Sequence, residues 1–300
     1  MHEHAAAGGG LGDLFLGVFL ESIEIIAIVF VLMALVELFE LKFSRFIRRY
    51  ITQNLAGQYT FCSFLGVTPG CSGSFAADSL YMAGIIGYGG IVSTLTATFG
   101  DEAFVMIAAA LDPSNAIKVS DVVILMAALV VSGIAAGALA DFFKRATGMR
   151  VNEKCAIEHH GEFEARGFDF RHFVVEHLWG HILKRHLPKI YLWLLGTMLV
   201  IGVLQHSFDL NQIVTNNQTI LLFLGVIVGI LPVSGPNLIF ISLFAQGQIG
   251  FAVLIANSLV QDGHGLLPLL GYSLEDSLKI KLFKVVFGLA VGAILLALGF

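Results

Sequence analysis

The sequence predicts an all-α integral membrane protein built from two inverted repeats of five apolar segments each. Three observations support this fold class: the composition, the order of ten apolar runs, and the placement of the basic residues. The 300 residues are 57% hydrophobic and 13% charged, with a mean hydropathy of +0.85. Soluble domains contain roughly 25% charged residues. A water-soluble core of this length could not bury so much apolar surface, whereas a bilayer accommodates it.

Composition also excludes several classes of protein. The net charge is −5, and no basic cluster with interleaved aromatic residues occurs, so we expect no nucleic-acid partner. Three cysteines, Cys62, Cys71 and Cys155, show no recurring spacing that would indicate a disulfide framework or a zinc site. The first basic residue is Lys42, so the N-terminus lacks the basic region of a cleaved signal peptide. We therefore expect the first span to remain in the protein.

Ten apolar segments follow one another along the chain. The longer runs are 14–38, 91–111, 119–140, 187–204, 251–270 and 282–300, and the shorter ones are 56–67, 74–86, 219–231 and 238–245. The four short runs cannot cross a core of about 30 Å as straight helices. Each short pair flanks a helix-breaking cluster, formed by Pro69, Gly70 and Gly73 in the first pair and by Pro232, Gly235 and Pro236 in the second. The pattern predicts two broken helical hairpins.

The two breaker regions resemble each other at an offset of 163 residues. Pro69, Gly84, Ile86, Gly87 and Tyr88 are matched by Pro232, Gly247, Ile249, Gly250 and Phe251. At the same offset, Gly100-Asp101 faces Gly263-His264. We therefore predict a short extracytoplasmic N-terminus over 1–12, a first transmembrane repeat over 13–141, a linker over 142–186, and a second repeat over 187–300.

Basic residues predict the orientation of the repeats. If the N-terminus lies outside and each short pair returns the chain to the side it entered from, segments 39–55 and 142–186 and a loop near 271–284 lie inside. All Lys and Arg except Lys118 then lie in or beside these inside segments, which is a strong positive-inside signal. The linker is then cytoplasmic, the C-terminus lies outside, and the second half is inverted. Inverted repeats with broken helices are typical of secondary transporters, which bind substrate near the midplane.

Ionisable residues inside spans are the first candidates for a site, because each costs at least about 2.5–3.5 kcal/mol at the bilayer centre. Glu21 and Glu24 lie in the first span, Asp101 and Glu102 lie in 91–111, and Asp262 and His264 lie in 251–270; Asp78 follows the first breaker. On this map no Lys or Arg lies deep in a span. We therefore expect the buried acids to be balanced by a cation, by protons, or by both.

We assign ligand roles by residue type. Asp101, Asp262 and His264 are the expected metal ligands, with Glu21, Glu24 and Glu102 as ligands or proton carriers. Neutral polar residues that could line the pathway are Ser72, Ser234, Asn237, Asn257 and Gln261. Asp78 either joins the pathway or caps the adjacent half-helix, and Cys71 is either a soft ligand or a packing residue. Carboxylate, carbonyl and imidazole together suit Mn²⁺, Fe²⁺ or Zn²⁺, and we favour Mn²⁺.

The linker carries six of the ten histidines. His177 and His181 are four residues apart, a spacing that lets two imidazoles on one helix share a metal. With His159 and His160 they form a candidate accessory metal site. The alternative is an amphipathic interfacial helix whose histidines bind nothing.

The sequence resembles the ten-transmembrane-helix heavy-metal exporter family, whose members are labelled arsenic efflux protein or manganese transporter. The resemblance rests on the motifs 68–73 to 78–81, 100–103, 232–236 to 243–247, 256–258 and 261–265. It implies metal efflux at the inner membrane of a bacterium, and leaves the ion open. The linker contains fewer histidines than the very His-rich linkers of the family.

We therefore expect a secondary transporter that exports a divalent metal in exchange for protons. No GxxxxGK motif followed by Ser or Thr occurs, so ATP hydrolysis is not expected. We expect no permanently bound cofactor; the partners are the bilayer, the metal ion and protons, and a homodimer remains open. One alternative is transport of arsenite or another oxyacid at half-helix N-termini with Cys71. A remote alternative is an intramembrane metalloenzyme using Asp262 and His264.

Overall fold

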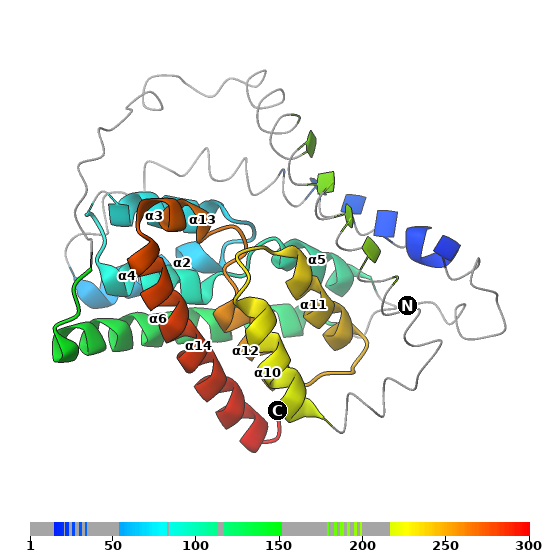
Figure 1. Cartoon of the computed structure of the whole chain (residues 1–300). Coiled ribbons are helices and arrows are strands. Elements are labelled where there is room, and N and C mark those ends of the chain that lie inside the picture. Colours follow the sequence, from blue (N-terminus) through cyan, green and yellow to red (C-terminus); the bar gives the residue numbers. More distant parts are fainter. Residues whose placement is uncertain are drawn as a thin grey trace.

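The computed structural model describes residues 54–82, 84–112, 117–151 and 217–300, together with scattered positions between 15 and 34 and between 179 and 199. These residues form helices and no strand. The half of the chain coloured cyan to green lies beside the half coloured yellow to red (Figure 1). Outside the described residues lie Glu21, Glu24, His159, His160, His177 and His181.

Between residues 54 and 151, the described part of the first half contains five labelled helices. They are α2 (Leu55–Val67), α3 (Ser72–Met82), α4 (Tyr88–Ala97), α5 (Glu102–Leu111) and α6 (Val119–Thr147). α2 begins where the Asn54 side chain accepts a hydrogen bond from the backbone N–H of Ala56. α6 ends at Gly148, which has a φ of +65°, a common way to stop a helix. This helix therefore continues beyond residue 141, where we predicted the end of the first repeat.

The second half follows the same order. Its elements are α10 (Gln218–Gly229), the short 3₁₀ helix η4 (Gly235–Asn237), α11 (Leu238–Ala245), α12 (Phe251–Val260), α13 (Leu267–Tyr272) and α14 (Leu274–Ala297). The Ser273 side chain caps α14 by accepting a hydrogen bond from the N–H of Asp276. The prediction that 271–284 is a loop is therefore wrong, because the cap starts the helix before the apolar run begins.

The turns before α4 and α12 are built alike. The bounds of the two helices are 163 residues apart. Gly84 and Gly247 have φ values of +70° and +67°. Their N–H groups donate hydrogen bonds to the backbone carbonyls of Tyr81 and Phe244, at 2.9 Å in both cases. Before α4, the side chain of Gln58 in α2 accepts a hydrogen bond from the N–H of Gly87 at 3.1 Å. Before α12, the side chain of Gln218 in α10 accepts one from the N–H of Gly250, also at 3.1 Å.

Two segments that we predicted as unbroken spans are broken in the structure. The run 91–111 divides into α4 and α5 around Gly100, and the run 251–270 divides into α12 and α13 around Gly263. The chain also breaks at the two predicted clusters, where α2 ends at Val67 and α10 ends at Gly229. In the part of the chain that the structure describes, each half therefore contains two breaks. The second was not foreseen because each apolar run has the length of a normal span and glycine alone is tolerated inside a helix.

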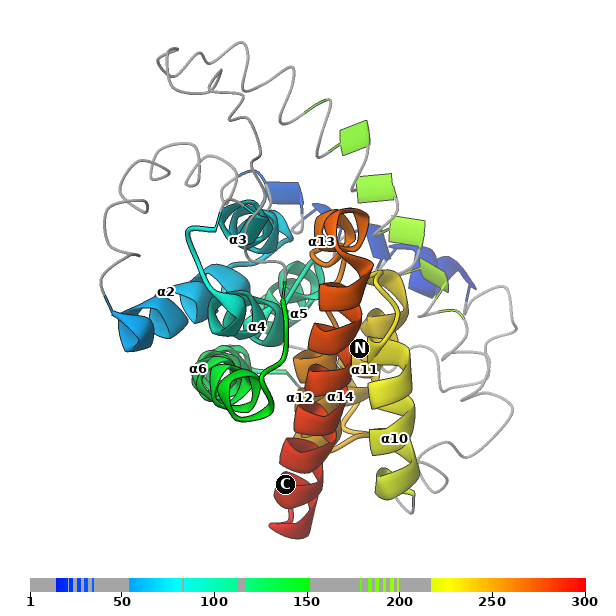
Figure 2. The ribbon, with the colours of Figure 1, turned by 60° about the vertical axis from the view of Figure 1, so that its left-hand side comes forward.

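The central helices are α4 and α12. All residues of α4 are buried, as are those of α12 after Phe251. α4 packs against α2 and α6, α12 packs against α10 and α14, and the two also contact each other. Figure 2 shows α10 and α14 side by side at the edge of the second half. The breaks that end α4 and α12 therefore lie inside the molecule.

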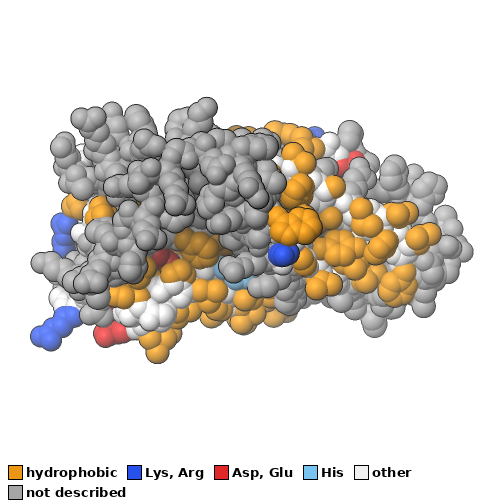
Figure 3. Space-filling view, turned by 90° about the horizontal axis from the view of Figure 1, so that it is seen from above, with side chains coloured by type: hydrophobic (Ala, Val, Ile, Leu, Met, Phe, Trp, Pro, Cys, Tyr) orange, Lys and Arg blue, Asp and Glu red, His pale blue; other side chains and the backbone are white. Residues whose placement is uncertain are grey.

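The outer helices present apolar side chains. Among the described residues, α6 and α14 are long and apolar enough to cross a membrane, and four shorter helices are apolar. Only 33% and 28% of the residues in the most apolar stretches of α6 and α14 are buried, so these helices are not the core of a soluble protein. Hydrophobic side chains also dominate the described surface in Figure 3.

Candidate metal-binding site

Three potential metal ligands each follow a glycine with positive φ. The pairs are Gly70-Cys71, Gly100-Asp101 and Gly263-His264, and the glycine φ values are +94°, +70° and +54°. Glycine adopts this conformation without steric cost, so the chain turns sharply at each position. Cys71 and Asp101 directly precede the first residues of α3 and α5, and His264 lies shortly before α13. The ligands therefore lie where the breaks give way to new helices.

The breaks are tied to one another by hydrogen bonds. The N–H of Gly70 donates to the carbonyl of Gly100 at 2.9 Å, which places Cys71 next to Asp101. The Gln261 side chain donates from Nε2 to the carbonyls of Thr98 at 2.9 Å and Phe99 at 3.1 Å. This second link joins the end of α12 to the end of α4, and it brings the Gly263-His264 turn to the same place.

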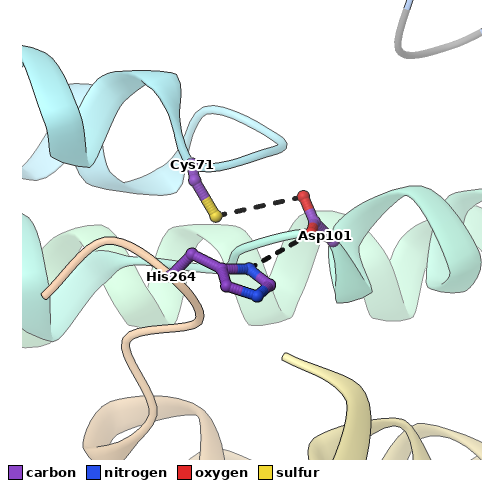
Figure 4. A group of neighbouring side chains, drawn as sticks. All are labelled: Cys71, Asp101 and His264. Atoms are coloured by element: carbon purple, nitrogen blue, oxygen red, sulfur yellow. Dashed lines mark hydrogen bonds and ion pairs between the residues drawn. The ribbon is translucent and has the colours of Figure 1, made fainter. Parts of the chain in front are cut away.

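We call Cys71, Asp101 and His264 the donor cluster (Figure 4). Cys71 Sγ lies 4.0 Å from Asp101 Oδ1, and His264 Nδ1 lies 3.8 Å from Asp101 Oδ2. One ligand atom from each residue lies within 4.8 Å of the others. Ligands at 2.0–2.3 Å from a tetrahedral ion are separated by about 3.3–3.8 Å. A small contraction therefore brings the three donors around one ion.

The donor cluster is buried on one side and accessible on the other. Cys71 is 5% exposed and Asp101 is 3% exposed, whereas the side chain of His264 is 26% exposed. Water is therefore largely excluded from the thiol and the carboxylate, which strengthens their interaction with a cation. Only part of the imidazole reaches the surface, since its Nδ1 atom, which faces Asp101, is buried.

Further polar atoms surround the donor cluster. Glu102 Oε1 and Oε2, Gln261 Oε1 and Ser234 Oγ are buried and have no hydrogen-bond partner among the described residues. A Cβ atom on Gly100 would lie 2.5 Å from Glu102 Oε2 and 3.6 Å from Gln261 Oε1, and one on Gly263 would lie 2.7 Å from Ser234 Oγ and 3.5 Å from Cys71 Sγ. Buried polar atoms without partners are costly, and a bound cation would satisfy these oxygens.

We expected Asp262 to share a metal site with His264, but in the structure it lies in a different set of contacts. It forms ion pairs with Lys281 and Lys284, and both Asp262 and Lys284 are fully buried. The prediction that the buried acids have no basic partner is therefore wrong for this residue. The error follows from the start of α14, because its early cap turns a supposed loop into a helix that carries both lysines inward.

Two expected neutral ligands have structural partners. Asn257 Nδ2 donates to the carbonyl of Gly225 at 2.9 Å and to Asn237 Oδ1 at 2.8 Å, and Asn237 Nδ2 donates to the carbonyl of Val233 at 3.1 Å. These bonds tie α10, η4 and α12 together. Ser72 is the first residue of α3. We infer that the two asparagines hold the break at Ser234 in place.

Asp78 is not part of the donor cluster. Its side chain is fully buried, and neither carboxylate oxygen has a hydrogen-bond partner among the described residues. It interacts electrostatically with Asp262. Asp78 therefore lies near the carboxylate that pairs with the two lysines.

Sequence patterns could have identified two of the features that we missed. The order glycine–donor occurs at all three ligands, although we applied it only to Asp101 and His264. Lys281 and Lys284 are three residues apart and so lie on one face of a helix, which predicts a common partner if α14 is extended toward Ser273. The identity of that partner depends on tertiary contacts.

Comparison with known proteins agrees with the apolar, helical architecture. A family model described as "Putative, 10TM heavy-metal exporter" matches residues 17–221 and 190–298. No curated protein and no solved structure matches the chain. The two matched ranges together span nearly all of the sequence. The chain therefore belongs to the ten-transmembrane heavy-metal exporter family, whose members are multi-pass membrane proteins.

Proposed function

We propose that this protein is a secondary-active exporter of a divalent transition metal and that the donor cluster is its binding site. The observation that carries this proposal is the convergence of Cys71, Asp101 and His264 from three separate helix breaks, with ligand atoms within 4.8 Å. Membership of a heavy-metal exporter family supports a metal as the substrate. Glu102, Gln261 and Ser234 would complete the coordination through oxygen.

The donor set favours a borderline metal such as Zn²⁺ over Mn²⁺. We favoured Mn²⁺ when the expected ligands were carboxylates, imidazole and neutral oxygens. With Cys71 beside Asp101, the set contains a thiolate, which suits Zn²⁺ or Fe²⁺ better than the oxygen-seeking Mn²⁺. A thiol must lose its proton to bind metal, so metal binding releases a proton at the site. This release provides a chemical basis for proton exchange.

The halves would act as inverted repeats around this site. The matching turns before α4 and α12, and the four breaks in equivalent positions, support two related halves with a site between them. The orientation stays as the sequence predicts it, in a bacterial inner membrane with both termini outside. Lys281 and Lys284 are buried in α14 and no longer count as loop charges. All other basic residues except Lys118 still lie in or beside the segments predicted to be cytoplasmic, so the positive-inside argument for this orientation is unchanged.

Metal flux in proteoliposomes tests the proposal. Wild-type protein should transport Zn²⁺, and Cys71→Ser should lower Zn²⁺ affinity about 10-fold while changing Mn²⁺ transport little, because a hydroxyl is a harder and weaker ligand than a thiolate. Cys62→Ser is the matched control, since Cys62 is also a buried free cysteine but lies within α2. Equal Zn²⁺ affinity in all three proteins would remove Cys71 from the site.

Arsenite is the second candidate, because the thiol of Cys71 lies at the start of α3. Thiolates bind soft ions, and helix N-termini favour electron-rich ligands. The nearby carboxylates of Asp101 and Glu102 disfavour an anion. Arsenite flux that depends on Cys71 and persists in Asp101→Asn would establish this candidate in place of the divalent metal.

A further inference from the structure

Two buried lysines of α14 occupy a cage of oxygen atoms. Lys281 Nζ donates to the carbonyls of Gly229 and Val260, both at 3.0 Å, and to Asp262 Oδ2. Lys284 Nζ donates to the carbonyls of Leu95 at 2.5 Å and Gln261 at 3.0 Å, and to Asp262 Oδ1. We call these four carbonyls and the Asp262 carboxylate the oxygen cage.

The oxygen cage gathers the C-terminal ends of three half-helices. Gly229 and Val260 are the last residues of α10 and α12, Gln261 is the C-cap of α12, and Leu95 lies in the last turn of α4. The final carbonyls of a helix lack intrahelical partners and carry partial negative charge. At such ends of broken helices, secondary transporters bind their coupling Na⁺ or H⁺. The cage is therefore built like a monovalent-cation site.

The oxygen atoms that accept hydrogen bonds from the two lysines fit this interpretation. Two ammonium groups face the single carboxylate of Asp262. Removal of Lys284 takes this donor away from the carbonyls of Leu95 and Gln261 and from Asp262 Oδ1. Buried oxygen atoms without partners are costly, so a small cation that fills the vacancy would stabilise the fold.

We propose that the oxygen cage is a monovalent-cation site that the chain has closed with its own ammonium groups. Lys281 and Lys284 act as resident cations that hold the ends of α4, α10 and α12 together. A freely diffusing Na⁺ or K⁺ is then not needed for stability. The transport corollary, that metal efflux does not require Na⁺, rests on the proposed function, whereas the cage itself does not.

Thermal unfolding of the purified full chain tests the cage. The midpoint is measured at equal ionic strength in NaCl, KCl and N-methyl-D-glucamine chloride, whose organic cation is too large for the cage. Wild type should unfold at the same temperature in all three salts. Lys284→Met should unfold at a lower temperature in N-methyl-D-glucamine, and saturating Na⁺ or K⁺ should raise the midpoint by about 5 °C.

Two further variants keep this test decisive. Lys281→Met removes the lysine at the edge of the cage, whose side chain is 10% exposed, and should show a smaller rescue if Lys284→Met does not fold. Lys279→Met is the matched control, because this lysine lies on the same helix but pairs with the exposed Glu275. The proposal is overturned if wild type is stabilised by Na⁺ or K⁺, or if the cage variants respond to salt as Lys279→Met does.

Flux measurements test the transport corollary. Zn²⁺ export by wild type should proceed at the same rate with Na⁺ or N-methyl-D-glucamine, whereas export by Lys281→Met should require Na⁺ or K⁺. Na⁺-dependent export by wild type would overturn the corollary. If wild type moved no metal, the proposed function would fail, and the unfolding experiment would still decide whether the cage binds cations.

Discussion

The donor cluster and the oxygen cage are separated by a single residue in the sequence, yet they use opposite ends of broken helices. His264 joins Cys71 and Asp101, whereas Asp262, on the other side of Gly263, joins Lys281 and Lys284. The donors Cys71 and Asp101 lie where α3 and α5 begin. Lys281 and Lys284 lie within α14, and their ammonium groups contact carbonyls at the C-terminal ends of α4, α10 and α12. The helix dipole favours negative groups at N-termini and cations at C-termini. The two regions therefore divide by charge for one physical reason.

This division teaches how a buried carboxylate should be interpreted. Asp101 lies near a thiol and an imidazole, which are residue types that bind metal ions together with carboxylates. Asp262 is an equally buried carboxylate, but two ammonium groups already balance it. Depth in the membrane identifies both as unusual, and only their neighbours separate a ligand from a structural ion pair.

The largest expected effect comes from breaking the cage at its centre. Asp262→Asn leaves two buried ammonium groups without their carboxylate, and we expect it to lower the free energy of unfolding by about 3–5 kcal/mol. Chemical denaturation of the purified protein measures this loss. Glu275→Gln, which removes the exposed partner of Lys279, should produce no measurable change. A stable Asp262→Asn protein that has lost metal binding would show that the two regions are one site.

The next effect separates the two carboxylates by function. Asp101→Asn should weaken Zn²⁺ binding about 100-fold, because it removes the charged ligand between Cys71 and His264. Isothermal titration calorimetry on the purified protein measures the affinity. Folded Asp262→Asn should retain Zn²⁺ affinity within about threefold, since its charge is used by the lysines. Equal losses in both variants would contradict the division.

The smallest effect concerns the glycine that sets the position of Asp101. Gly100→Ala forces a Cβ atom to 2.5 Å from Glu102 Oε2 at a φ of +70°, so it should cost about 1–2 kcal/mol in stability and lower Zn²⁺ affinity. Gly148→Ala is a matched control, because Gly148 has a φ of +65° and no atom within 4 Å of the added Cβ. Both variants should lose stability, and only Gly100→Ala should also lose metal affinity.

The sequence predicted the chemistry of the breaks better than their number. Pro69 and Pro232 identified the first break in each half, because proline cannot continue a helix through its interior. The second breaks, at Gly100 and Gly263, lie within apolar runs of normal length, and glycine alone is tolerated inside helices at a modest cost. Nevertheless, the polar residues beside these glycines already marked Asp101 and His264 as candidates.

Sequence by itself predicted a membrane protein with acidic residues and a histidine inside apolar runs, because composition and hydropathy pattern do not depend on the fold. It also determined the matching order of breakers in the two halves. Tertiary structure alone decided which groups meet. Asp262 and Lys284 are held together by a fold that also brings Leu95 to them, and Cys71 reaches His264 across almost two-thirds of the chain. Such contacts depend on how the broken helices cross, and residue order alone does not specify that crossing.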